Sequence, residues 1–595
     1  MTSLKTILTT KQQCIILLTV AFCLNFNTLF NDYTVDDETV ITNNSFVQKG
    51  IKGIPEIICQ NYFKGDNKIN VGEFSGGRYR PFTLIVFAVE YQCFGANPFV
   101  SHLINVLLFT LLIALLFKLF HNPIFREKDK YLAFFSCLLF AVHPIHTEVI
   151  ANVKSRDEMI TFILLIISLL TFLKNTEKKN RWLFFTSMLC FFLALLTKET
   201  AITFIIIVPL ILYFFFNHSV KRSVLLTIPL IIVFAGYALL RLFIIGIPHS
   251  GISDIVNAPF ILATPAQAFA TKVFILLKYL GLLIFPHPLS WEYGYNQIPY
   301  VELSSIQFIF SISVLIGLSA YAIYSLKKKT LISFCILYFF ITISLVANFI
   351  ADTGAPLAER FLFQPSLAFC IATASLYINI HKKSKVIATA FMLIILILFS
   401  VKSFMRNGEW KNNETLATTD VISSPNSIRA NMAAAYIYLT KTNTETDLEL
   451  KKEYLKKAAY YSERALKIHF NNPRALIDLE FASSHLFDYY DSVDLWLKAC
   501  YLDPSQPEAK IIMTALADNS YRQGNAFFEK NNNDAAIRYY KKCVELNNKH
   551  TESWYNLGGN YYIKGDSINA LKAWEKVKLL DPHHLFKKED FLRTN

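Results

Sequence analysis

The stretch FVSHLINVLLFTLLIALLFKLF, from Phe99 to Phe120, decides the class of fold. It contains one charged side chain, Lys118, and about 20 apolar residues in a helix suffice to cross a bilayer. Similar runs of roughly 16 to 22 residues recur from Cys14 to about Phe404. They account for the 53% hydrophobic and 17% charged residues of the 595-residue chain, too apolar for a water-soluble protein of this size. We therefore predict an all-α fold that begins with a polytopic membrane helix bundle over residues 1–405.

The basic loops predict the orientation of this bundle. Lys and Arg outnumber Asp and Glu by 58 to 45, and in a membrane chain this surplus favours cytoplasmic loops over nucleic-acid binding. The expected cytoplasmic segments are the N-terminus, 126–130, 174–181, 218–222, 327–329 and 381–385. Alternation then places outside the connections 31–98, 150–158, 197–200, 246–303 and 352–360, together with the C-terminal half. The count predicts about eleven spans.

Two apolar segments are not expected to cross the membrane. Residues 268–285 are interrupted by Lys272 and Lys278, and a crossing there would put the 327–329 cluster on the wrong side, so we expect this segment to lie in the interface. Residues 81–94 are short and contain Glu90 before a Gly-Ala-Asn-Pro break. They predict a juxtamembrane helix along the outer surface.

After Trp410 the sequence becomes more polar and repeats itself. Ile468 and Leu502 are 34 residues apart, as are Leu546 and Leu580, and the cleanest copy runs from Glu552 to Pro582. A 34-residue period of this kind is the tetratricopeptide signature. About four such helical hairpins would stack into a soluble α-solenoid with a concave binding surface. We expect a linker at 406–425 and the repeat domain at 426–595.

Ionisable side chains gather on the predicted outer face, where each costs free energy near hydrocarbon, so a functional site is expected there. The candidates are Asp36, Asp37, Arg80, His143, His146, Glu148, Arg156, Lys198, Glu199, Glu359 and Arg360. Paired carboxylates with Arg, Lys and His suit acid/base chemistry on a phosphorylated, lipid-borne substrate: the carboxylate takes a proton and the cations neutralise a phosphate leaving group.

Each of these residues also has a structural interpretation. Asp36 and Asp37 can cap a helix, His143 and His146 can be satisfied interface histidines, and Lys198 with Glu199 can form a simple turn ion pair. No cofactor is assigned: a divalent cation could bind the Asp pair, but no third ligand follows at a recognisable spacing, and no metal site is predicted. Cys59 and Cys93 are expected to be separate thiols.

Six motifs in this order, with the repeats behind them, resemble the transmembrane and tetratricopeptide-repeat protein O-mannosyltransferases (the TMTC type). The motifs are VDDETVITNN at 35–44, YRPFT at 79–83, HLINVLL at 102–108, HPIHTE at 143–148, LTKE at 196–199 and AERFLFQPS at 358–366. The resemblance covers essentially the whole chain. That family is similar to the wider GT-C glycosyltransferases, which are multi-span enzymes with lumenal or periplasmic active sites.

The resemblance implies transfer of a hexose, mannose above all, from a polyprenyl-phosphate donor of the dolichyl or undecaprenyl type to protein Ser/Thr hydroxyls, with inversion. Acceptor proteins would come through the repeat domain, and no nucleic acid is involved. It further implies an acidic base in the first external loop, here Asp36 with Asp37 orienting or replacing it, and a cation on the donor phosphate, for which Arg360, Lys198 and Arg80 are the candidates.

The short repeat tail favours a bacterial plasma membrane with a periplasmic site over the endoplasmic reticulum with a lumenal one. Two other functions stay open. One is a non-enzymatic membrane-anchored scaffold that collects proteins on its repeats, although a scaffold needs a single anchor rather than many spans. The other is a lipid-linked oligosaccharide ligase or polymerase, which would share the donor class and transfer a preassembled glycan.

Overall fold

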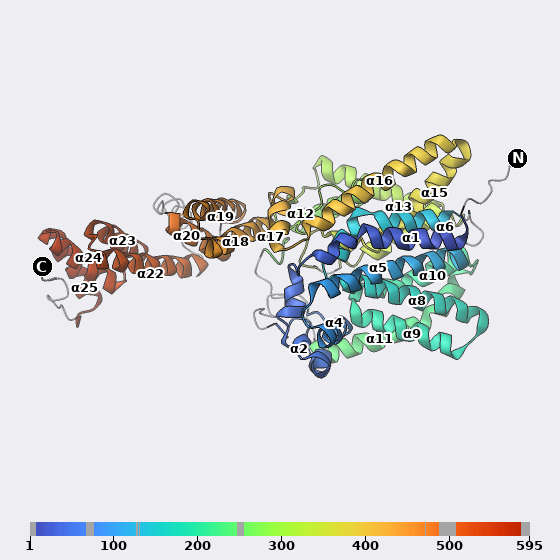
Figure 1. Cartoon of the computed structure of the whole chain (residues 1–595), viewed down its shortest axis with the longest axis horizontal. Coiled ribbons are helices and arrows are strands. Elements are labelled where there is room, and N and C mark those ends of the chain that lie inside the picture. Colours follow the sequence, from blue (N-terminus) through green and yellow to red (C-terminus); the bar gives the residue numbers. More distant parts are fainter. Residues whose placement is uncertain are drawn as a thin grey trace. The chain divides into compact units, whose positions relative to one another are not determined.

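A computed structural model describes residues 8–66, 77–125, 129, 131–246, 255–350, 352–470, 472–486 and 507–584. These residues form helices and loops, and within them no β-strand occurs, only two isolated bridges. The chain divides into two compact units, Met1–Ile437 and Tyr438–Asn595 (Figure 1). The predicted all-α class is confirmed.

The first unit is a bundle of long helices. α1 (Thr10–Leu24) precedes the outer loop 31–98, and the loop contains α2 (Ser45–Gln48), α3 (Ile54–Cys59) and α4 (Pro81–Phe94). The bundle continues with α5 (Pro98–Leu119), α6 (Leu132–Val142), α7 (Thr147–Ala151), α8 (Arg156–Lys178), α9 (Arg181–Thr197), α10 (Phe204–Phe215) and α11 (Val220–Ile245). It closes with α12 (Pro265–Ile284), α13 (Ile306–Tyr324), α14 (Leu331–Ile343), α15 (Ser366–Lys383), α16 (Lys385–Glu409), α17 (Asn413–Ser423) and α18 (Ile428–Thr444).

Local signals in the sequence set the ends of α4 and α5. Both helices begin with Pro, whose missing N–H is not needed in the first turn. α4 ends at Gly95, which adopts a φ of +64°, a conformation that L side chains rarely take. The side chain of Asn97 then accepts the N–H of Val100 and caps α5. The predicted juxtamembrane helix 81–94 therefore has the expected bounds.

The number of spans differs from the prediction. Seven helices of the described residues are long and apolar enough to cross a membrane, or eight if the bent pair Leu132–Val142 and Pro144–Ala151 is one span. The expected count of about eleven is not confirmed: α9, α14 and the helix Glu199–Phe215 are apolar but have at most 17 residues, and they are not among the seven.

α12, expected in the interface, meets the length and composition criteria for a span. Its position relative to α13 nevertheless agrees with an even number of crossings. Gln267, in the first turn of α12, donates to Glu302, just before α13, at 2.7 Å. The starts of α12 and α13 thus lie at the same end of the bundle, and the interface placement of 268–285 stays a prediction.

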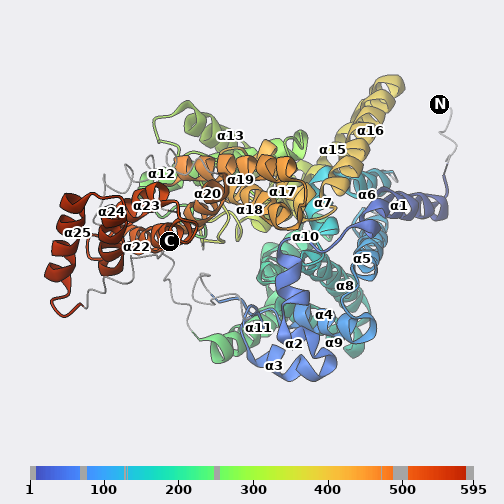
Figure 2. The ribbon, with the colours of Figure 1, turned by 60° about the vertical axis from the view of Figure 1, so that its left-hand side comes forward.

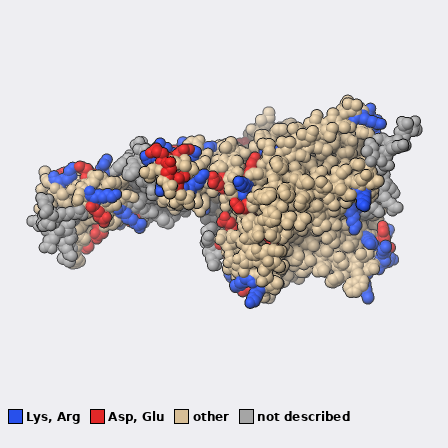
Figure 3. Space-filling view, viewed as in Figure 1, with Lys and Arg blue, Asp and Glu red and all other residues tan. Residues whose placement is uncertain are grey.

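Two of the loops expected to be cytoplasmic lie close together. Lys329 donates to Asn217 at 3.1 Å, which joins the 327–329 cluster to the loop before α11. At the other end of α11, Arg241 donates to the carbonyl of Gly77 at 3.0 Å. In Figure 3 the middle of the bundle shows almost no charged side chains, whereas Lys and Arg gather at its right-hand edge.

The segment 406–425 is not a free linker. It contains the end of α16 and all of α17, and the fully buried Arg406 forms an ion pair with Asp420. Asp420 also accepts the N–H of Trp291 at 2.6 Å. The polar composition of this segment suggested a linker, because composition does not reveal that these charges pair with each other. The division between the two units falls at Ile437 instead.

The second unit contains the predicted helical hairpins. Its helices are α19 (Leu448–Ile468), α20 (Pro473–Leu486), α22 (Pro507–Glu529), α23 (Asn533–Leu546), α24 (Thr551–Ile563) and α25 (Ser567–Leu580), visible from another side in Figure 2. A Cβ on Gly524 would overlap the Tyr540 ring, and one on Gly558 would overlap the Trp574 indole. The pair Gly558 and Trp574 follows the pair Gly524 and Tyr540 after one repeat period. The hairpins α22–α23 and α24–α25 therefore each pack a glycine against an aromatic ring. Leu502 lies outside the described residues.

Candidate active site

A cavity of about 520 Å³ opens at the predicted outer end of the first unit. Its lining includes six cationic side chains, which we call the cationic wall, next to the carboxylates of Glu199 and Asp352: Arg78, Arg80, Lys154, Lys198, Arg241 and Arg360. It also includes apolar side chains, which we call the apolar wall, among them Ile202, Phe234, Leu242, Val346 and Phe361. A cavity lined by both cationic and apolar side chains fits a ligand that joins a phosphate to a hydrocarbon chain.

The structure separates the roles of the two neighbouring aspartates. Asp37 is fully buried, and its carboxylate accepts the N–H of Thr34 at 3.0 Å and the N–H of Lys154 at 2.6 Å. It ties the outer loop to the turn before α8, and it caps no helix. The side chain of Asp36 is 53% exposed, and its partner is the ammonium of Lys154 at 3.1 Å. Of the pair, Asp36 is the carboxylate open to a substrate.

The two aspartates also differ in acidity. Burial acts to raise the pKa of Asp36, but Lys154, Arg360 and Arg78 outweigh it and lower that pKa to about 2. Burial raises the pKa of Asp37 to about 7, against the lowering effect of its backbone N–H bonds and with a further increase from the charge of Asp36. Asp36 is therefore ionised throughout the physiological range, while Asp37 titrates within it.

Buried carboxylates hold the cations of the cavity wall. Arg80 contacts Asp157 and Glu199, each at 2.8 Å. Lys198 contacts the same Asp157 at 3.0 Å and Glu158 at 2.8 Å. Lys198 and Glu199, neighbours in sequence, thus pair with different partners rather than with each other. The shared carboxylate fixes both cations toward the cavity and reduces their mutual repulsion.

Arg360 is held by Glu148. The carboxylate of Glu148 accepts the backbone N–H of Arg360 at 2.8 Å and also binds its guanidinium. This double contact joins α7 to the outer turn after α14 and aims Arg360 into the cavity. Arg360 is also close enough to Asp36 to lower the pKa of that carboxyl.

Four of the predicted site residues lie away from the cavity. His143 donates to the carbonyl of Leu283 at 3.0 Å, and His146 donates to that of Phe140 at 2.8 Å. Arg156 is buried against Glu90 and donates to Asn105 at 2.6 Å. Glu359 accepts the hydroxyl of Tyr293 at 2.9 Å. These buried contacts join helices and loops, and for both histidines they favour the structural interpretation.

Replacing His146 should therefore affect stability rather than chemistry. In H146F a ring of similar size stays between Phe140 and Phe363, but the carbonyl of Phe140 loses its donor. We expect a loss of about 1–3 kcal/mol in the free energy of unfolding. Thermal unfolding in detergent measures it. The donor KM of the folded variant should stay within twofold of the wild type. A large rise in that KM would show that His146 contributes to the binding of the donor.

Sequence reasoning missed four residues of this cavity: Arg78, Lys154, Arg241 and Tyr237. Arg241 carried a usable signal, because it is a lone charge near the end of an apolar run. Tyr237, one turn of α11 before Arg241, also lines the cavity. Its buried hydroxyl has no hydrogen-bond partner among the described residues. Such a hydroxyl is available to a bound ligand.

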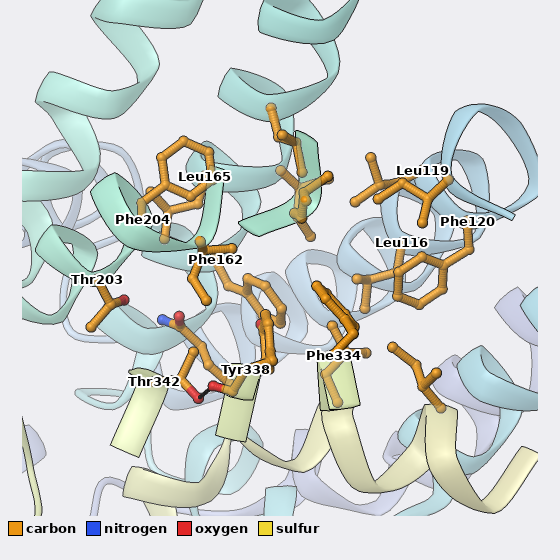
Figure 4. Close-up of a pocket in the computed structure, with 18 of the residues that line it drawn as sticks. Leu116, Leu119, Phe120, Phe162, Leu165, Thr203, Phe204, Phe334, Tyr338 and Thr342 are labelled. Carbon is orange, nitrogen blue, oxygen red and sulfur yellow. Dashed lines mark hydrogen bonds between the residues drawn. The ribbon is translucent and has the colours of Figure 1, made fainter. Parts of the chain in front are cut away.

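A second cavity, of about 50 Å³, lies deeper, between α5, α8, α10, α14 and α15 (Figure 4). Its lining is mostly Leu, Ile and Phe, and the labelled Thr342 bonds back to its own helix at Tyr338. It holds no ionisable pair suited to catalysis. No group of three or more His, Cys, Asp or Glu that could hold a metal ion occurs in the part of the chain that the structure describes.

Comparison with known proteins gives two family matches. Residues 81–245, which run from α4 to the end of α11, match the family described as Dolichyl-phosphate-mannose-protein mannosyltransferase. Residues 517–550 match the Tetratricopeptide repeat. The second match falls on α22 and α23, where the packing of glycine on an aromatic ring recurs.

Curated relatives extend the likeness along the chain. The Homo sapiens Protein O-mannosyl-transferase TMTC3 is 24% identical and covers 94% of this chain and 67% of its own length. The Caenorhabditis elegans Protein O-mannosyl-transferase F38B6.6 is 25% identical over 69% of this chain and 58% of its own. The Homo sapiens Protein O-mannosyl-transferase TMTC1 is 26% identical, with 78% and 56% covered.

The chain spans about three fifths of the length of these relatives. Its apolar helices make it a multi-pass membrane protein with a tetratricopeptide repeat near its C-terminus. As its motifs predicted, the chain is similar over most of its length to the transmembrane and tetratricopeptide-repeat protein O-mannosyltransferases.

Proposed function

We propose that this protein is a membrane glycosyltransferase that moves a mannose from a polyprenyl-phosphate donor to Ser or Thr hydroxyls of proteins. The observation that carries the proposal is the cavity with one cationic and one apolar wall, next to the exposed carboxylate of Asp36. The names of the relatives and of the matching family supply the sugar, the dolichyl-type donor and the protein acceptor.

In this proposal the donor phosphate lies against Arg360, Arg78 and Lys198, and the first isoprene units lie against the apolar wall. Asp36 accepts the proton of the acceptor hydroxyl while the oxygen of that hydroxyl bonds to the anomeric carbon. The bond from that carbon to the phosphate oxygen breaks at the same time, and its electron pair leaves with the polyprenyl phosphate. The cations stabilise the charge that develops on this leaving group.

Attack on the face opposite the leaving group inverts the anomeric centre. The repeat unit supplies the recognition of acceptor proteins, as solenoid surfaces commonly do. We place the cavity on the lumenal or periplasmic side, opposite the basic loops. The relatives named above are animal proteins, which favours an endoplasmic-reticulum membrane over the bacterial one that the short repeat tail suggested.

The direct test uses the purified full-length chain in lipid nanodiscs. Dolichyl phosphate mannose and undecaprenyl phosphate mannose, each with a labelled hexose, are offered with a library of Ser/Thr peptides. Mass spectrometry should find one added hexose on a hydroxyl residue, with the anomeric configuration opposite to that of the donor. Transfer of a preassembled glycan, or no transfer from either donor, would contradict the proposal.

The activity should depend on pH through Asp37. Above about pH 7 both oxygens of the ionised Asp37 accept N–H groups and fix the loop, and its charge makes Asp36 more basic. We expect kcat/KM to rise with pH through about 7 and to lose this limb in D37N. The folded pKa exceeds that of an unfolded Asp, so the stability of the wild type relative to D37N should fall from about pH 4 to 7. An unchanged limb in D37N would rule out this assignment.

A further inference from the structure

The backbone just before Asp36 adopts an unusual conformation. Val35 has a φ of +49°, in the left-handed region that a β-branched residue rarely enters. A residue keeps such a conformation only where its surroundings hold it, and strained positions of this kind cluster at active sites. Because the next residue is Asp36, whatever holds Val35 also sets the direction of the carboxylate.

One side chain from outside the loop spans this turn. Asn413, the first residue of α17, accepts the N–H of Val35 on its Oδ1 at 2.8 Å. Its Nδ2 donates to the carboxylate of Glu38 at 3.1 Å. The Asn413 amide therefore bridges the residue before Asp36 and the second residue after it.

Two further hydrogen bonds between the loop and this region use backbone carbonyls as acceptors. The N–H of Asp32 donates to the carbonyl of Lys411 at 2.8 Å, and the side chain of Asn31 donates to that of Asn407 at 3.1 Å. Substitutions at 407 and 411 leave these acceptors in place. Removal of the Asn413 side chain therefore breaks the hydrogen bond to Val35 and leaves these two backbone contacts intact.

α17 itself is firmly anchored. Asp420, near its end, binds the buried Arg406 and the N–H of Trp291. Leu416, one turn after Asn413, packs with Trp410 and Ala151, and the side chain of Val35 contacts the same cluster. The cluster that anchors α17, and with it Asn413, therefore also contacts the side chain of the strained residue Val35.

We propose that Asn413 is a positioning residue: it holds the left-handed turn at Val35 and so fixes the Asp36 carboxylate against the cavity. This proposal rests on the proposed function of Asp36. The segment between α16 and the repeats then belongs to the active site. The identity of its residues, and not its length alone, matters for the reaction.

Four variants of the full chain test this role with labelled dolichyl phosphate mannose. N413A should lower kcat about 10- to 100-fold while the donor KM stays within twofold, because the cationic wall is intact. N412A is the matched control: Asn412 caps α17 through Thr415, and its side chain has no hydrogen bond to the described residues of the loop, so its kcat should stay near that of the wild type. Equal kcat values for N413A and N412A would overturn the proposal.

A charge exchange supplies the rescue. In N413D the new carboxylate still accepts from Val35 but faces Glu38, so kcat should fall. In N413D/E38Q the glutamine amide can donate to the carboxylate introduced at position 413, in the reverse direction, and most of the lost kcat should return. Absence of any rescue would contradict a bridge between Val35 and Glu38.

Hydrogen exchange separates this inference from the proposed function. The amide of Val35 should exchange faster in N413A than in N412A whether or not the wild type transfers mannose. Faster exchange together with an inactive wild type would retain the bridge and reject the transferase. Unchanged exchange in N413A would reject the bridge even in an active enzyme.

Discussion

Replacing Asp36 by Asn should lower kcat about 10²- to 10⁴-fold, the range expected when a general base is lost. The reason is geometric: Asp36 is the exposed carboxylate of the pair, it lies 3.1 Å from Lys154, and its low pKa keeps it ionised. Asn has nearly the same shape but does not accept a proton. The donor KM should change little, because the amide still contacts the cationic wall.

Release of labelled hexose from dolichyl phosphate mannose to a Ser/Thr peptide measures this effect. D32N is the matched control: Asp32 is exposed, lies in the same loop and loses the same charge, and its kcat should stay within twofold. D36N also removes the carboxylate partner of the buried Lys154 and should lower the unfolding temperature, so thermal unfolding must show that D36N is still folded at the assay temperature. Full activity of D36N would exclude Asp36 as the base and leave the cavity without a proton acceptor.

Removing Arg360 should have the second large effect, a drop in kcat/KM of about 10²- to 10³-fold for the lipid donor. Arg360 lines the cavity, is held by Glu148 and acts on the charge of Asp36. The loss should fall on kcat more than on KM, because the phosphate gains charge as the bond to the sugar breaks. R360K should lie between the wild type and R360A, since a lysine keeps the charge without the planar fork.

R360A also leaves the buried Glu148 without its cation, which can unfold the protein. R360A/E148Q avoids this, because the glutamine keeps an acceptor for the backbone N–H of residue 360. The double variant should fold like the wild type and keep the catalytic defect. R181A, an exposed arginine at the start of α9, is the control for lost positive charge. R181A loses the same single charge as R360A, whereas R360A/E148Q keeps the net charge of the wild type. Equal losses in R181A and R360A, with no loss in R360A/E148Q, would show a general charge effect and not a phosphate contact.

Much of the fold followed from local patterns. Runs of apolar residues predicted the long helices, the repeat period predicted the hairpins of the second unit, and a proline followed by a glycine gave the bounds of α4. The basic loops predicted which helix ends face the cytoplasm, and the contact of Lys329 with Asn217 brings two of these loops close together. These features depend on neighbours along the chain, so a single sequence suffices to predict them.

The sequence also located the outer face as the place for the site, but it did not assign the roles there. Composition suggested a linker at 406–425, where the structure has a packed anchor that carries Asn413. Arg156 and Arg80 look alike in sequence, yet one lies buried against Glu90 and the other lines the cavity. Composition does not reveal which charges find a partner, because that depends on the packing of distant helices.

By itself, then, the sequence determined the helical class, the two-part organisation and the family likeness. Tertiary structure alone decided that Asp36 is open and Asp37 buried, and that both histidines make buried hydrogen bonds to backbone carbonyls. It also decided that Asn413, 378 residues away, bridges the turn at Val35. The physical reason is that burial and pairing depend on groups distant in the chain, whereas helix formation and hydrophobic periodicity depend on groups that are close.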